Sequence, residues 1–135
     1  MALSKEVLDE FGNTKLFMLS TASKDGIPNV VPVAMVILQD DNETIWIVDN
    51  FMCKTLANLK ENPVASLLIC NQGSPDSYQL KGKVTIESSG ADYEVARDIA
   101  HKRKETLPAK NLVKLRIEKE YYVTPGPKAG KKVTF

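Results

Sequence analysis

Short runs of β-branched and other apolar residues, divided by turn-forming residues, dominate the chain and predict strands. Six such runs lie at 16–22, 29–38, 44–48, 63–70, 78–87 and 111–123. The last two alternate apolar and polar residues, as expected for strands with one face in solvent. The run at 29–38 is almost continuously apolar, which predicts one strand covered on both faces. Asp25 and Gly26, between the first two runs, predict a hairpin turn.

Helical signals are confined to three short segments. The first, near residues 3–12, starts at a candidate N-cap, Ser4, and ends at Gly12. The second starts near residue 54 and ends before Asn62 and Pro63. The third starts at Ser89 with a candidate capping box. Its buried face is expected to be the stripe formed by Ala91, Val95 and Ile99.

This order of elements predicts a mainly β fold with short helices. Six strands in sequential hairpins favour a small antiparallel barrel, because a doubly wound fold needs a regular alternation of strands and helices. A chain of 135 residues is long enough for a single core, and no repeat or linker divides it. We therefore expect a single domain over residues 1–135.

The charge is nearly balanced overall but unevenly distributed. A formal net charge of +1 argues against general nucleic-acid affinity. Residues 1–100 carry 8 basic and 14 acidic side chains, and residues 101–135 carry 10 and 3. The basic region could be a docking surface for an anionic partner, or simply a solvated helix end followed by a lysine-rich tail.

Cysteine usage and hydropathy bear on the compartment. Cys53 and Cys70 are far apart and form no C-x-x-C motif, which favours free thiols in a reducing compartment. No signal peptide is visible, and the longest apolar run, 30–38, is too short to span a membrane. We expect a soluble, cytoplasmic protein without nucleic-acid or membrane partners.

The inventory of catalytic side chains is thin. His101 is the only histidine, and it begins a basic cluster near a predicted helix end, where positive charge is favoured. Zinc-ligand spacing, a nucleophile elbow and a glycine-rich phosphate loop are all missing from the sequence, so no metal and no catalytic residue is assigned. An enzyme without a general-base constellation usually takes its chemistry from a cofactor.

The segment 49–59 carries the strongest chemical signal. It begins where an apolar strand ends and runs directly into the second helix, so Lys54 and Thr55 fall in a first helical turn. Unpaired N–H groups and the helix dipole favour an anion there, and these two side chains add a positive charge and a hydroxyl donor. An ordinary surface helix start is the alternative. A phosphate is the leading interpretation, with the rest of a flavin on the apolar residues 30–34.

The order of these pieces resembles the pyridoxamine-phosphate-oxidase-like FMN-binding split-barrel family, and within it the small flavoproteins. The resemblance is carried by LSTASKDGIPNVVPV at 19–33, IWIVD at 45–49, CKTLANLKENP at 53–63 and LKGKV at 80–84. It implies a split antiparallel β-barrel of six to seven strands that forms a homodimer. The full-length oxidase has more arginine around its phosphate and a distinct substrate-binding C-terminus. This chain shows neither feature clearly, which argues against carrying over the oxidation of vitamin B6.

The resemblance also implies a cofactor site for FMN at the dimer interface. Lys54 and Thr55 would hold the phosphate, and Cys53 lies beside them at the helix start. The ring would lie along the second strand, and the loop after the third strand would lie near the ribityl chain. Tyr121, Tyr122 or Pro125 of the partner subunit would approach the ring. The residues assigned to the cofactor are Val31, Pro32, Val33, Asp49, Asn50, Phe51, Cys53, Lys54, Thr55 and Tyr122.

The function implied is that of a small FMN-dependent oxidoreductase or electron carrier with a small-molecule or protein redox partner. Relatives in the superfamily take the deazaflavin F420 or haem, so an F420-dependent reductase is one alternative. A non-catalytic flavin carrier or binding module is another.

Overall fold

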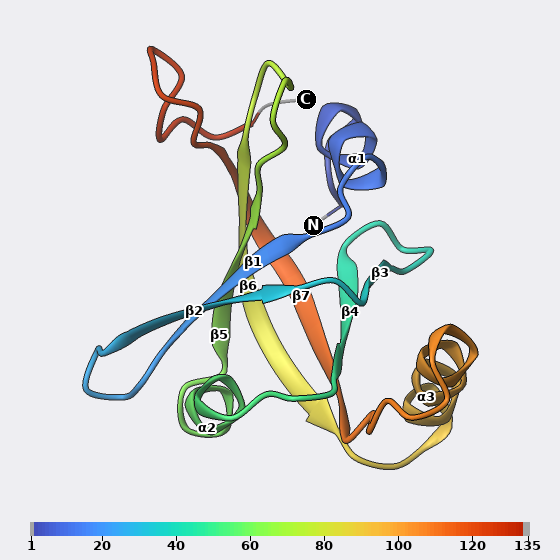
Figure 1. Cartoon of the computed structure of the whole chain (residues 1–135). Coiled ribbons are helices and arrows are strands. Elements are labelled where there is room, and N and C mark those ends of the chain that lie inside the picture. Colours follow the sequence, from blue (N-terminus) through green and yellow to red (C-terminus); the bar gives the residue numbers. More distant parts are fainter. Residues whose placement is uncertain (1, 134–135) are drawn as a thin grey trace.

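The computed structural model describes residues 2–133 and contains three helices and seven strands within them (Figure 1). The helices are α1 (Lys5–Gly12), α2 (Lys54–Glu61) and α3 (Ala91–Arg103). The strands are β1 (Phe17–Ala22), β2 (Pro28–Val33), β3 (Val36–Leu38), β4 (Thr44–Asp49), β5 (Val64–Ile69), β6 (Tyr78–Glu87) and β7 (Asn111–Tyr122).

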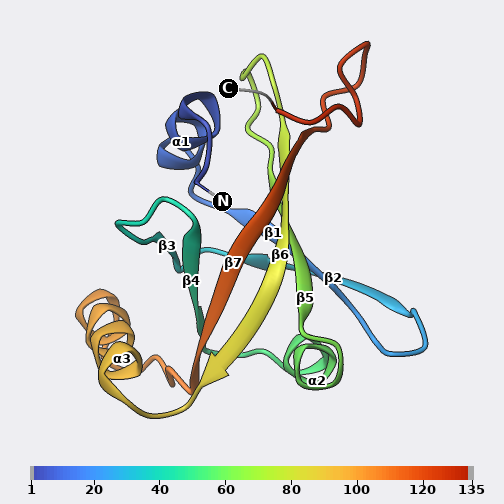
Figure 2. The ribbon, with the colours of Figure 1, turned by 180° about the vertical axis from the view of Figure 1, so that it is seen from behind.

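All seven strands belong to one antiparallel sheet in the order β2-β1-β5-β6-β7-β4-β3. β2 and β3 are the two edges of this sheet, yet only Ala34 and Met35 separate them in the chain. A link of two residues spans at most about 11 Å between the flanking Cα atoms. The sheet therefore curls until its edges approach one another without pairing, which gives a split barrel (Figures 1 and 2). The predicted fold is confirmed.

Two groups of buried side chains hold this arrangement together. The larger lies inside the barrel, where alternate residues of the strands meet Val7 and Phe11 of α1. The smaller lies between α3 and the sheet, around Trp46 and Leu112. α1 and α3 thus cover separate parts of the barrel, and α2 lies at the same end as α3 (Figure 1).

A glycine permits the closest backbone contact in the curled sheet. The pairing of β6 with β7 shifts register between Lys81 and Gly82, and such bulges increase local twist. A Cβ atom on Gly82 would lie 1.9 Å from the carbonyl oxygen of Arg116, so only glycine fits there without a backbone shift.

The run at 29–38, predicted as one strand covered on both faces, is two strands with a break between them. β2 is a sheet edge on which inward Val31 and Val33 alternate with outward Val30 and Pro32. Val30 is 61% exposed. The prediction failed because apolar content alone does not tell whether the second face is covered by the same chain.

The stripe predicted for the third helix is also wrong. Val95 and Ile99 are exposed, and the buried residues are Ala96 and Ala100, whose small side chains let α3 lie close to the sheet. The expected capping box is missing too. The N-cap is Gly90, and Asp92 pairs instead with Lys114 of β7 at 2.6 Å.

No helix in the part of the chain that the structure describes is long and apolar enough to cross a membrane.

Candidate functional site

A pocket of about 440 Å³ lies at the split of the barrel. β2 and the link to β3 form one wall, and the end of β4 with its following loop forms another. The start of α2 and the end of α3 complete it. Its lining residues are Asn29, Val31, Pro32, Val33, Ala34, Met35, Val48, Asn50, Phe51, Met52, Cys53, Lys54, Thr55, Arg103 and Leu107.

The start of α2 faces this pocket with its backbone donors available. The N-cap is Cys53, and no side chain caps the helix. The Ala57 N–H is bonded to the carbonyl oxygen of Cys53 at 3.1 Å, so the N–H groups of residues 54–56 precede the first intrahelical bond. With the positive end of the helix dipole and the exposed Lys54, they form a site suited to an anion.

Thr55 is held by a small network of side-chain amides and hydroxyls. Its side chain is only 1% exposed, and its Oγ1 accepts a hydrogen bond from Asn29 Nδ2 at 3.0 Å. The same amide lies 3.3 Å from Thr21 Oγ1, which also accepts from Asn58 Nδ2 at 3.1 Å. Since the Thr55 oxygen acts as the acceptor for Asn29, its own proton is free to be donated to a ligand.

Asp49, the last residue of β4, is buried and fixes the loop between β4 and α2. This carboxylate is fully buried and accepts the Met52 N–H at 2.9 Å and Asn111 Nδ2 at 2.8 Å. Lys110 Nζ lies 3.8 Å from it and donates to the Met52 carbonyl oxygen at 3.1 Å. Asn50 ties the loop to the segment before β7, because its Oδ1 accepts the Ala109 N–H at 3.0 Å.

The remaining walls are largely apolar. Val31 and Val33 point from β2 into the barrel, and Met35, Val48 and Leu107 belong to the cluster under α3. Phe51 lies in the loop at the pocket and is 76% exposed. An apolar wall next to an anion site suits a ligand with a flat apolar body and a charged end.

The structure brings together eight of the ten residues predicted for the cofactor site, all but Asp49 and Tyr122. Asp49 lies beneath the loop, where it positions the backbone of its neighbours and does not line the pocket.

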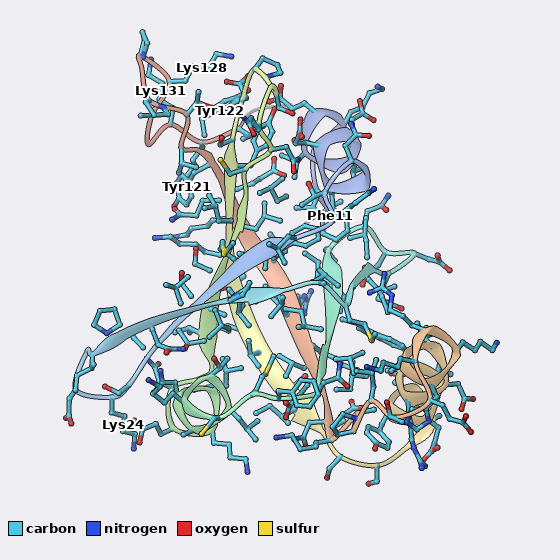
Figure 3. All side chains as sticks on the ribbon, in the orientation of Figure 1. Phe11, Lys24, Tyr121, Tyr122, Lys128 and Lys131 are labelled. Atoms are coloured by element: carbon cyan, nitrogen blue, oxygen red, sulfur yellow. The ribbon has the colours of Figure 1, made fainter. Side chains whose placement is uncertain are left out.

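Tyr122 lies towards the other end of the sheet, next to the C-terminal segment and away from α2 (Figure 3). Its hydroxyl donates to Glu6 of α1, and this bond raises the pKa of Tyr122 to about 12. Its ring lies 5.6 Å from that of Tyr78, and Lys128 Nζ lies 4.9 Å from its centroid. Within its own subunit, Tyr122 packs against Tyr78 and is bonded to α1. Its approach to the pocket of a partner subunit stays a prediction.

Sequence reasoning missed several lining residues. Asn29 could have been noticed as a polar residue inside an apolar run. Arg103 was grouped with its basic neighbours, and nothing local separates it from them. Met52 was passed over although it stands between two predicted residues, Phe51 and Cys53. Three others become neighbours only through the curling of the sheet: Met35, Val48 and Leu107. Ala34 belongs to the apolar residues 30–34 already predicted to carry the flavin.

The basic region at 101–135 is not one surface. Arg103 lines the pocket, whereas Lys128 pairs with Asp76 at 3.1 Å near the C-terminal segment. His101 does not line the pocket, and its Nε2 is 2.9 Å from the Leu107 carbonyl oxygen. Cys53 and Cys70 are free thiols, and no group of three His, Cys, Asp or Glu side chains within residues 2–133 could hold a metal ion.

Comparison with known proteins gives consistent matches over nearly the whole chain. A sequence profile of the family described as "Pyridoxamine 5'-phosphate oxidase" matches residues 3–124. The uncharacterized protein MJ0282 of Methanocaldococcus jannaschii is 36% identical over 131 residues, which cover 96% of this chain and 86% of that protein.

Solved structures show the same fold. HupZ from Group A Streptococcus is 25% identical, with a TM-score of 0.80 over 95% of this chain and 99% of that one. An FMN-binding protein from Syntrophomonas wolfei is 20% identical, with a TM-score of 0.73 over 87% of this chain and 83% of that one.

Replacing Asp49 tests whether one buried carboxylate fixes the loop. We expect Asp49→Ala to lower the free energy of unfolding by about 2–4 kcal/mol, because two donors lose a charged acceptor in a buried place. Urea denaturation at a fixed protein concentration measures this change. The exposed Asp40 offers a control, and Asp40→Ala should change stability by less than about 0.5 kcal/mol. A loss for Asp49→Ala as small as that of the control would contradict the anchoring role.

Proposed function

This chain belongs to the pyridoxamine 5'-phosphate oxidase family, and on that premise we propose that it binds FMN in the pocket at the split of its barrel. The observation that carries the proposal is the start of α2, where uncapped N–H groups, Lys54 and the Thr55 hydroxyl meet beside an apolar wall. The phosphate would bind there.

The energetics require both parts of the site. A lysine within about 4 Å of a phosphate gains roughly 4 kcal/mol per unit charge at an effective dielectric constant of 20, and exposure of Lys54 reduces this gain. Micromolar affinity requires about 8 kcal/mol. The difference has to come from burial of the ring, at roughly 25 cal/mol per Å² of apolar surface. Val31, Val33 and Leu107 would provide that surface.

The bound flavin would supply electron or hydride transfer. The protein's own residues would hold it. The start of α2 would fix the phosphate, the apolar walls would exclude water, and the Asp49-anchored loop would stay in place beside the ligand. We propose that the protein acts as a small oxidoreductase or electron carrier.

Two features favour FMN over other ligands of this fold. Haem iron is commonly held by histidine, and the single histidine of this chain is engaged outside the pocket. F420 would favour a more basic phosphate pocket than the one cation at the start of α2 provides. A flavin carrier without catalysis remains the second candidate function, because the pocket is lined by no general acid or base pair in the described residues.

We also propose a homodimer, built on the outer face of the sheet. The strand register places Pro32, Met18 and Leu68 side by side in one row that ends at Tyr121. The neighbouring row begins with the exposed Val30. β2 lines the pocket with Asn29, Val31 and Val33 on its other face, and Pro32 borders the pocket from the outward row. A second copy docked here would therefore lie next to the ligand, as the family resemblance implies. A twofold interface uses the same patch on both subunits.

The same register distinguishes the two tyrosines. Tyr121 belongs to the outward row and has Lys81 Nζ 5.8 Å from its ring centroid. Tyr122 points inward and is bonded to Glu6. Tyr121 is therefore the better placed of the two to contact a partner subunit.

The first test is the visible absorption spectrum of the freshly purified protein, followed by chromatography of the released chromophore. We expect a yellow protein that releases FMN. Release of F420 would support the pocket as a cofactor site but contradict FMN as the cofactor. A haem spectrum would contradict flavin binding. A colourless protein that fails to take up added FMN would overturn the proposal.

Lys54→Ala tests the phosphate site. We expect FMN to bind at least tenfold more weakly, a loss of about 1.4 kcal/mol, while riboflavin, which lacks the phosphate, binds equally well to both proteins. Fluorescence titration measures both affinities. Lys60→Ala, at the last turn of the same helix, should leave both unchanged. An equal loss for riboflavin would show that Lys54 does not act through the phosphate.

Val30→Lys tests the dimer face. We expect light scattering to give twice 14.9 kDa for the wild type and 14.9 kDa for this variant, because a charge would be buried in the interface. Val95→Lys, which places the same charge on the exposed face of α3, should remain dimeric. A wild-type monomer that still holds FMN would refute an interface site.

A further inference from the structure

Arg103 is the one residue of the basic cluster at 101–104 that lines the pocket. It is the last residue of α3, and Lys102 and Lys104 on either side of it do not reach the lining. Favourable interaction with the helix dipole explains why basic residues gather at this end of α3. It does not explain why one of them turns to the ligand site.

The end of α3 is held in place by contacts on several sides. Ala96 and Ala100 are buried against the sheet, and the Tyr93 hydroxyl donates to the Ala109 carbonyl oxygen at 2.7 Å. His101 Nε2 lies 2.9 Å from the Leu107 carbonyl oxygen, which ties the helix to its following loop. These contacts hold the helix end that carries Arg103.

Arg103 approaches the pocket from the end opposite to Lys54. Asn29, at the start of β2, is bonded to Thr55 and so marks the α2 end. Val33, at the end of β2, is four residues further along, about 13 Å in a strand, and Met35 in the following link lies in the same cluster as Leu107. Figure 1 shows α2 and α3 on the two sides of this end of the barrel, with the loop after β4 between them.

The two cations have no acid to neutralise them. No Asp or Glu lines the pocket within the described part of the chain. The ion pairs formed among residues 2–133 include neither Lys54 nor Arg103. The pocket thus has positive charge at both ends and apolar walls between them.

We propose that Arg103 recognises negative charge on the ring end of the ligand, and so binds the reduced flavin more tightly than the oxidised one. This inference rests on the proposed function, which assigns the phosphate to the α2 end and leaves the ring towards Arg103. Two-electron reduction adds one proton at N5, and near neutral pH leaves one negative charge shared by N1 and the C2 carbonyl. The oxidised ring is neutral.

A guanidinium group suits this charge, because its planar array of donors matches two neighbouring acceptors better than a single ammonium does. Preferential binding of the reduced form raises the two-electron potential by linkage. A tenfold difference between the two affinities corresponds to about 30 mV. Arg103 is thus a positioning and potential-setting residue, and the protein would favour the reduced state of its flavin.

The test compares the FMN-loaded wild type with Arg103→Gln. Titration with dithionite against a reference dye, at low ionic strength, gives the potential, and fluorescence titration gives the affinity for oxidised FMN. We expect the potential to fall by about 30 mV in Arg103→Gln, with less than threefold change in oxidised FMN affinity. Arg103→Lys should recover part of the shift. Lys102→Gln removes the same charge one residue away. It should leave the potential within about 10 mV of the wild type, a third of the shift expected for Arg103→Gln.

Riboflavin, which lacks the phosphate, shows whether Arg103 acts on the ring or on the phosphate. The Arg103→Gln shift should persist with riboflavin if the side chain acts on the ring, and it should disappear if the side chain contacts the phosphate, which would overturn the inference. Equal potentials for wild type and Arg103→Gln, or an equal shift in Lys102→Gln, would also overturn it. FMN binding that is intact in all these variants leaves the proposed function standing, whereas a wild type that binds no flavin refutes both.

Discussion

The two-residue link between β2 and β3 is the constraint on which the rest of the structure depends. Ala34 and Met35 connect strands that form opposite edges of one seven-stranded sheet, so the sheet has to curl until those edges approach. The edges do not pair, and the opening between them is the place where a ligand can lie against the barrel. A sheet that closed fully would have no such pocket, and a flat one could not be linked in this way.

The pocket divides its tasks between different kinds of residue. Backbone donors at the start of α2 offer an anion site, and Asn29 holds the Thr55 side chain in the pocket lining beside it. Asp49 is buried and does not line the pocket, but it holds the loop that does. Arg103 reaches the opposite end from a helix that packs through alanines. Lys54 and Arg103 are both exposed, so water weakens the action of the charge at each end.

Much of the fold could be predicted because its signals are local. Alternation in 78–87 and the Asp25-Gly26 turn require only neighbouring residues to be interpreted, and β6 and the first hairpin follow them. Errors came where burial is decided by distant elements. Val95 and Ile99 have the larger apolar side chains, but α3 turns its alanines inward because they allow a closer approach to Trp46 and Leu112. The break at Ala34 and Met35 was missed because nothing in an apolar run marks the place where a sheet ends.

The sequence alone predicted the positions of the strands along the chain, apart from the break at Ala34 and Met35. It also predicted that Lys54 and Thr55 lie in a first helical turn, and it carried the resemblance to the family. These depend on periodicity, on turn chemistry and on residues adjacent in the chain. Only the tertiary structure decided that Asp49 lies beneath the loop, that Tyr122 is engaged with Glu6, and that Arg103 joins the pocket. Each of these depends on contacts between residues more than 50 positions apart, or on which face of an element turns inward. Local patterns carry no information on such contacts, because they are fixed by how the whole sheet curls.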